Sequence, residues 1–95
     1  MDNQKYIVRC DKSGVFYGEI AGRDGQEIEM RNARCLWRWE GAFTLIELAT
    51  SGTSNPKGCR FTAYASSLTV LDAIEIIPCT EQAVNSIEGV LAWQP

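Results

Sequence analysis

The sequence predicts an α+β fold: an antiparallel β-sheet meander, able to curl into a barrel-like form, with two short helices. Apolar and polar residues alternate through most of the first forty positions, which is typical of half-buried strands. Turn-forming residues separate these runs, and two later stretches carry helical spacing that ends near a glycine. The 95 residues are enough for one hydrophobic core, so we expect a single domain over residues 1–95.

Four strands are expected in the first forty residues. Residues 11–14 (DKSG) have turn chemistry, and Asp24-Gly25 between two alternating runs is a strong hairpin signal. Residues 31–33 then form a short connection. The expected strands are residues 5–11, 15–21, 26–30 and 34–39.

A short helix is expected after Gly41, because residues 42–50 have helical spacing and Gly52 is a suitable stop. Residues 51–58 are rich in loop-forming residues. An extended segment follows at residues 59–64. Residues 68–77 are rich in branched side chains and are interpreted as one strand, with a helix as the alternative.

A second short helix is expected after Pro78. Thr80 is a good N-cap, and Glu81 lies in the first turn, where the helix dipole favours a carboxylate. Gly89 ends this helix. Residues 90–93 are then expected to form a short closing strand.

The composition indicates the cellular compartment of the protein and disfavours one class of ligand. The net charge of −3 disfavours duplex nucleic acid, whose binding depends on an excess of lysine and arginine. The N-terminus has no hydrophobic run, and no apolar stretch approaches the ~20 residues needed to span a bilayer. We therefore expect a cytoplasmic protein that is not held in a membrane. Its four cysteines are expected to be reduced and buried, with a disulfide as the alternative.

Little in the sequence points to catalysis. The chain has no histidine, no nucleophile elbow and no phosphate-binding loop of the Walker type. The cysteines lack the paired spacing of a zinc site. Carboxylate pairs such as Glu27 with Glu29, or Asp72 with Glu75, are expected on a solvated surface. We therefore expect a binding protein rather than an enzyme, without a metal ion or cofactor.

Residues 31–43 concentrate arginines and aromatic residues in an otherwise acidic chain. In an extended strand, Arg34 and Arg38 stand about 13 Å apart on one face, and Trp37 and Trp39 point to the other. Two guanidinium groups in this arrangement suit a ligand with separated anionic groups. The alternative, which general residue statistics favour, pairs these arginines with Glu27 and Glu29 and buries the tryptophans.

The candidate ligand contacts are of two kinds. An aromatic base needs ring faces for stacking, and phosphates need guanidinium groups. Trp39 and Phe43 have the alternative role of anchoring the first helix to the sheet, and Arg9 and Arg60 could be merely solvated. The candidates are Trp37, Trp39 and Phe61 for stacking, and Arg9, Arg34, Arg38 and Arg60 for phosphates, with Phe43 and Tyr64 as further aromatic groups.

Several sequence blocks resemble a family of small phage-encoded proteins. This family is identified as the first-described Thoeris anti-defence family, and the resemblance extends from about residue 14 to residue 93. The matching blocks are GVFYGE at residues 14–19, NARxLWxWxGA at 32–42, LxxLAxxG at 45–52, NPKxCxF at 55–61 and IEIIPCT at 74–80.

The resemblance implies a molecular sponge. Such a protein binds the cyclic ADP-ribose signal that bacterial TIR-domain enzymes make from NAD and holds it without cleaving it, so the host effector stays inactive. It also implies homo-oligomers, from dimers to larger assemblies such as hexamers, in the cytoplasm of the infected bacterium, and cyclic oligonucleotides as further ligands of some members. Arg34 is the first position to which it assigns a ligand contact, and Phe61 the second.

Two other functions compete with sequestration. The chain could be a protein-interaction module that inhibits a host defence protein directly, with exposed aromatic residues as the binding hot spots. It could also bind single-stranded nucleic acid, with arginines on the phosphates and tryptophans on the bases.

Overall fold

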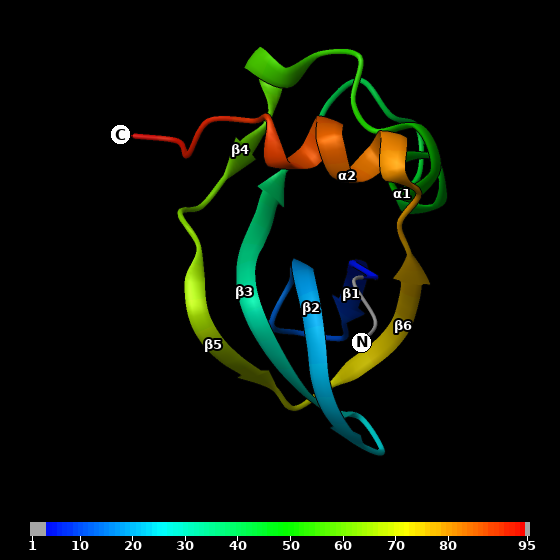
Figure 1. Cartoon of the computed structure of the whole chain (residues 1–95), viewed down its shortest axis with the longest axis vertical. Coiled ribbons are helices and arrows are strands. Elements are labelled where there is room, and N and C mark those ends of the chain that lie inside the picture. Colours follow the sequence, from blue (N-terminus) through cyan, green and yellow to red (C-terminus); the bar gives the residue numbers. More distant parts are fainter. Residues whose placement is uncertain (1–3, 95) are drawn as a thin grey trace.

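The computed structural model describes residues 4–94 and confirms the predicted α+β class. Six strands form one antiparallel sheet, which does not close into a barrel, and two α-helices and one 3₁₀ turn complete the fold (Figure 1). The elements are β1 (Tyr6–Cys10), β2 (Val15–Asp24), β3 (Glu27–Arg38), α1 (Leu45–Ser51), the 3₁₀ turn η1 (Pro56–Gly58), β4 (Arg60–Phe61), β5 (Ala65–Val70), β6 (Ala73–Pro78) and α2 (Glu81–Glu88).

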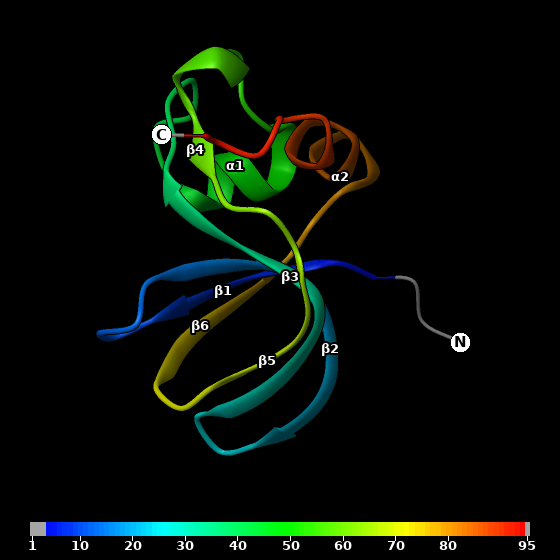
Figure 2. The same cartoon turned by 90° about the vertical axis from the view of Figure 1, so that its left-hand side faces the viewer.

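The sheet is strongly curled. Its order is β4-β3-β2-β1-β6, and β5 pairs with β3. The two helices lie together over one end of the sheet, and β5 and β6 curve away beneath them (Figure 2). The long strand β3 joins both regions, because its first part pairs with β5 and its last part with β4.

The strand β3 corrects the prediction of four strands in the first forty residues. Residues 26–30 and 34–39 were expected as separate strands, but a single strand runs through residues 31–33. Asn32 takes a left-handed backbone conformation with φ of 49°, and the pairing with β2 shifts register near this point. A bulge of this kind bends a strand without ending it. The first forty residues therefore form three strands.

The run at residues 68–77 is also corrected, since it forms two strands instead of one. The chain turns at Leu71 and Asp72, between β5 and β6. The carboxylate of Asp72 accepts hydrogen bonds from the backbone N–H groups of Lys12 (2.7 Å) and Ser13 (3.2 Å) and from the Ser13 hydroxyl (2.6 Å). The bonds from the Ser13 hydroxyl and the Lys12 N–H lower the pKa of Asp72. Asp72 thus joins two loops that are distant in sequence.

Both helices were predicted, and their caps explain where they begin and end. Helix α1 begins later than expected, since the hydroxyl of Thr44 accepts a hydrogen bond from the Glu47 N–H as an N-cap (3.1 Å). Gly52 ends it with φ of 78°. Phe43 was expected to anchor this helix, but its side chain is 91% exposed. Trp39 does pack against the core, as expected. Helix α2 has the predicted Thr80 cap.

The extended segments in the second half of the chain form fewer β-pairs than expected. Of residues 59–64, only Arg60 and Phe61 form a paired strand, β4. Residues 90–93 were expected as a closing strand, but they make only an isolated parallel bridge between Ala92 and Phe61. The backbone N–H of Trp93 donates a hydrogen bond to the Phe61 carbonyl (2.9 Å). This contact holds the C-terminal segment beside β4.

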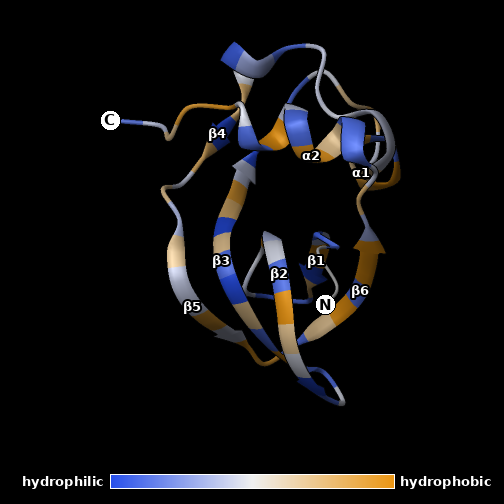
Figure 3. Ribbon diagram, in the orientation of Figure 1, coloured by the Kyte–Doolittle hydropathy of each residue, from blue (hydrophilic) through white to orange (hydrophobic). Residues whose placement is uncertain are grey.

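The sheet separates two clusters of buried side chains. Ile7 and Val8 on β1 are both fully buried but point to opposite faces, as alternation requires. Strand β6 is largely hydrophobic, whereas β3 alternates (Figure 3). The upper cluster lies between helices and sheet and includes Ile7, Tyr17, Leu36, Leu48, Phe61, Cys79 and Ile87. The lower cluster lies inside the curled sheet and includes Val8, Cys10, Ile28, Met30, Ala33 and Val70.

All four cysteines are free thiols, and Cys10, Cys59 and Cys79 are buried whereas Cys35 is half-buried. None of the described helices is both long and apolar enough to cross a membrane.

Stability is expected to fall in alkaline solution because of groups in the upper cluster. Burial raises the pKa of Cys79 to about 11 from its ordinary value of 9.0. Burial and a hydrogen bond to Glu88 also raise the pKa of Tyr17. The folded protein then holds these protons more tightly than the unfolded chain, so the stabilisation is complete below about pH 9 and declines as the pH rises toward 11. Urea unfolding across this range measures the decline, and Cys79→Ala should make it shallower. A midpoint that rises between these pH values would contradict the expectation.

Candidate ligand-binding site

The structure distributes the seven predicted site residues over three places. Arg34 lies in the interior. Four residues lie where β3 and β4 meet: Trp37, Arg38, Arg60 and Phe61. The remaining two, Arg9 and Trp39, line a separate cavity.

Arg34 is a buried structural residue, only 2% exposed. Its Nε donates a hydrogen bond to the Thr62 carbonyl (2.9 Å), and its Nη1 donates to the carbonyls of Ile87 and Val90 (both 3.0 Å). The ring of Tyr64 lies 4.6 Å from the guanidinium carbon. The guanidinium therefore joins β3 to the segment after β4 and to the end of α2. The expectation of a ligand contact at Arg34 is corrected accordingly, because burial and these bonds leave it no open face.

The alternative, in which Arg34 and Arg38 pair with Glu27 and Glu29, does not form either. Arg38 forms an ion pair with Glu40 (3.0 Å), and Glu29 forms one with Arg31 (2.8 Å). The carboxylate of Glu40 also accepts a hydrogen bond from the side chain of Asn55 (3.1 Å). The Arg38–Glu40 pair therefore belongs to the loop region above β3.

A bulge brings three candidate residues together at the end of β3. Leu36 pairs with Phe61, but Arg38 pairs with Arg60, so β3 has one extra residue here. Two residues of the bulged strand, Trp37 and Arg38, consequently lie opposite the single residue Arg60.

The half-buried side chain of Arg60 lies against two tryptophan rings. Its guanidinium carbon is 4.7 Å from the ring centre of Trp93 and 5.9 Å from that of Trp37. The two ring centres are 6.4 Å apart, with 30° between the planes. Among the described residues, no carboxylate forms an ion pair with Arg60. We call Trp37, Arg60 and Trp93 the tryptophan–arginine cluster.

Two hollows meet at this cluster. The smaller, of about 160 Å³, is lined by the cluster together with Phe61 and Thr62. The larger, of about 420 Å³, shares Trp93 with it and is also lined by Lys57 on η1 and by Leu91. The walls therefore combine aromatic faces with two cationic side chains. This combination can hold a flat aromatic group and an anion side by side.

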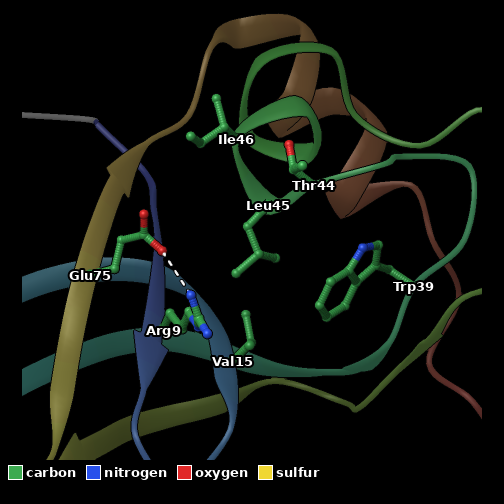
Figure 4. A pocket seen from close by; sticks show the side chains of 7 residues that line it. All are labelled: Arg9, Val15, Trp39, Thr44, Leu45, Ile46 and Glu75. Atoms are coloured by element: carbon green, nitrogen blue, oxygen red, sulfur yellow. Dashed lines mark ion pairs between the residues drawn. The ribbon is translucent and has the colours of Figure 1, made fainter.

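The other two predicted residues line a cavity of about 350 Å³ at another place. Arg9 and Trp39 lie on two sides of it, and Arg9 Nη1 is 3.8 Å from the carboxylate of Glu75 (Figure 4). This cavity shares no lining residue with the two hollows beside Trp93. The seven predicted residues thus do not form one site.

The family model of a domain of unknown function, DUF6948, matches residues 3–87, which is most of the chain. The chain belongs to the DUF6948 family. Searches among curated proteins and among solved structures gave no match. Two members of the cluster, Trp37 and Arg60, lie within the part matched to DUF6948, whereas Trp93 lies beyond it.

The sequence analysis missed two residues of this candidate site. Trp93 was assigned only to a closing strand, and Lys57 only to a loop. The third tryptophan of a chain whose other two lie in one strand was a signal for Trp93. Nothing local indicated Lys57, since its place beside Trp93 depends on the bridge between Ala92 and Phe61.

Proposed function

We propose that this DUF6948 protein binds a cyclic ADP-ribose signal made by bacterial TIR-domain enzymes and sequesters it without cleaving it. The observation that carries the proposal is the tryptophan–arginine cluster: a half-buried guanidinium that lies against two stacked indole rings and forms no ion pair with a described carboxylate. The resemblance to the Thoeris anti-defence family supports the same ligand.

The proposed contacts follow from the chemistry of the ligand. The adenine stacks on Trp37 or Trp93, and stacking of a base on an aromatic side chain is worth about 1–3 kcal/mol. The pyrophosphate binds Arg60, with Lys57 of the larger hollow as a further cation. Phe61 lies beneath the smaller hollow as its floor and, being fully buried, supports the site without an open face for the ligand. Arg34 supports the site from below, since its ring contact with Phe61 (5.4 Å) fixes that floor.

Sequestration rather than cleavage is proposed because of the groups that face the ligand. The smaller hollow is lined by three aromatic residues, Arg60 and Thr62, and the Thr62 hydroxyl donates a hydrogen bond to the Ala63 carbonyl. A general base with a pKa near neutrality would be needed to activate water at a phosphate or glycosidic bond.

We further propose that the protein works as a homo-oligomer, a dimer or larger, in the cytoplasm of the infected bacterial host. A sponge competes for a scarce ligand, and a nanomolar Kd corresponds to about −12 kcal/mol. Open hollows supply less than an enclosed site of the same composition. A second copy seated on Leu91, whose side chain is 87% exposed beside Trp93, would close the larger hollow.

Arg60→Met is expected to weaken cyclic ADP-ribose binding by about 10- to 100-fold, because charge-assisted hydrogen bonds to the pyrophosphate are lost. Isothermal titration calorimetry measures the change. Arg23→Met is the matched control, since Arg23 lies in the β2–β3 hairpin and contacts the Gly25 carbonyl. Equal losses in both variants, or no loss in Arg60→Met, would exclude the cluster as the site.

The fate of the ligand is tested separately. The protein is mixed with the purified TIR product, separated from free ligand and denatured, and the released nucleotide is identified by mass spectrometry. Intact ligand supports sequestration. Recovery of no ligand would exclude the proposed function, and recovery of a hydrolysed ligand would make the protein an enzyme.

A second candidate function is direct inhibition of a host defence protein. The observation that favours it is the exposure of large apolar side chains, with Phe43 and Leu91 almost completely open to solvent. Such residues are typical anchors of protein interfaces. A stable complex with a host protein that is unaffected by added nucleotide would support this candidate instead.

A further inference from the structure

The cavity beside Arg9 has features of a site in its own right. Its walls come from the end of β1, the start of β2, the start of β6 and the first turn of α1, with Trp39 closing one side (Figure 4). Its volume of about 350 Å³ lies at the lower end of the range for small-molecule sites, about 300–1,000 Å³. It is lined by Arg9, Val15, Trp39, Thr44, Leu45 and Ile46, together with Glu75.

One part of the cavity carries both signs of charge. Arg9 and Glu75 are cross-strand partners of β1 and β6, and their charged atoms are 3.8 Å apart. Both side chains are open to water, at 55% and 39% exposure. An ion pair this long and this exposed contributes little to stability. A ligand could therefore separate the two groups without a large cost.

The rest of the cavity is apolar and firmly supported. Val15, Trp39 and Leu45 are half-buried and pack against the upper cluster of the core. In Figure 4 these three side chains face the same space as the Arg9 guanidinium. The cavity therefore has an apolar wall fixed by core packing and a charged rim that can rearrange.

We propose that this cavity binds a free α-amino acid with an aromatic side chain, in its zwitterionic form. The α-carboxylate binds the guanidinium of Arg9, the α-ammonium binds the carboxylate of Glu75, and the ring packs against Trp39. An anionic ligand would face repulsion from Glu75, and a cationic one from Arg9. A zwitterion satisfies both, and its side chain removes apolar surface from water. This inference does not depend on the proposed function, because the two sites share no residue.

The test is a titration of the ¹⁵N-labelled full chain with L-phenylalanine, followed by NMR. We expect saturable shifts at the amides of Arg9, Val15 and Leu45 and at the indole N–H of Trp39. N-acetyl-L-phenylalanine lacks the ammonium and L-phenylalanine methyl ester lacks the carboxylate, so each should bind about ten-fold more weakly or worse. Arg9→Gln and Glu75→Gln should each weaken L-phenylalanine binding by a similar factor, and Arg23→Gln should leave it unchanged.

Several results would overturn the proposal. These are the absence of saturable shifts at tens of millimolar L-phenylalanine, equal binding of the N-acetyl compound, or shifts centred on Trp37 and Trp93. The dispersion of each variant's spectrum shows whether it is folded. Since Arg9 and Glu75 are exposed partners of a weak ion pair, both variants are expected to fold.

Discussion

Arg34→Met is expected to lower the free energy of unfolding by about 3–5 kcal/mol, a large part of the stability of a small domain. The variant removes the donor from the buried carbonyl of Val90 and from the partly buried hydrogen bond to the Thr62 carbonyl. A buried acceptor left without a partner costs about 1–3 kcal/mol. The contacts of the guanidinium with the rings of Phe61 and Tyr64 are lost as well. Urea unfolding followed by circular dichroism measures the loss.

Arg31→Met is the matched control for this prediction. Arg31 lies on the same strand, but its side chain is exposed and its partner Glu29 is exposed too. We expect a change within about 1 kcal/mol. Arg34→Lys should also destabilise the protein, since an ammonium lacks the planar fork that reaches three carbonyls. If Arg34→Met kept full stability but lost ligand binding, Arg34 would be a ligand contact and the structural role given to it here would be wrong.

Phe61→Ala is expected to lower the free energy of unfolding by about 3–5 kcal/mol, as is usual when a fully buried aromatic ring is deleted. Phe61 has no exposed surface, lies in the upper cluster and contacts the guanidinium of Arg34. Phe61 is also one of the residues that line the smaller hollow. Thermal and urea unfolding give the change in stability.

Phe43→Ala is the matched control, because it removes a phenyl ring from a residue that is 91% exposed. The free energy of unfolding is expected to change by no more than about 0.5 kcal/mol. A comparable loss in both phenylalanine variants would contradict the core described here. Loss of ligand binding in Phe43→Ala at unchanged stability would instead favour an interface through the exposed apolar residues.

Local signals in the sequence predicted the elements whose ends depend on neighbouring residues. The Thr80 cap and the glycine stops of both helices act within one helical turn, so their positions could be read from the chain. The alternation of the first strands was equally local. The bend at Asn32 is not determined locally, because pairing with both β2 and β5 keeps β3 continuous there. The turn at Asp72 likewise depends on its bonds to Lys12 and Ser13.

The candidate site shows the same division between local and long-range information. Composition indicated that arginines and tryptophans matter, and Arg60 does lie against two tryptophans. Which of them meet could not be derived, since Trp93 reaches Arg60 only through its backbone bond to Phe61. The family resemblance made Arg34 the first expected ligand contact. Its burial depends on carbonyls at Ile87 and Val90, which only the folded chain brings near.

The position of β1 has a consequence for how the chain folds during synthesis. Tyr6 pairs with Pro78 at the far end of β6, and Ile7 lies in a cluster with Ile87 of α2. Neither hydrophobic cluster can therefore be completed until most of the chain has left the ribosome. Contacts this distant in sequence slow folding and leave the apolar strands open to other molecules in the meantime. The nascent chain should accordingly remain sensitive to protease until α2 has emerged.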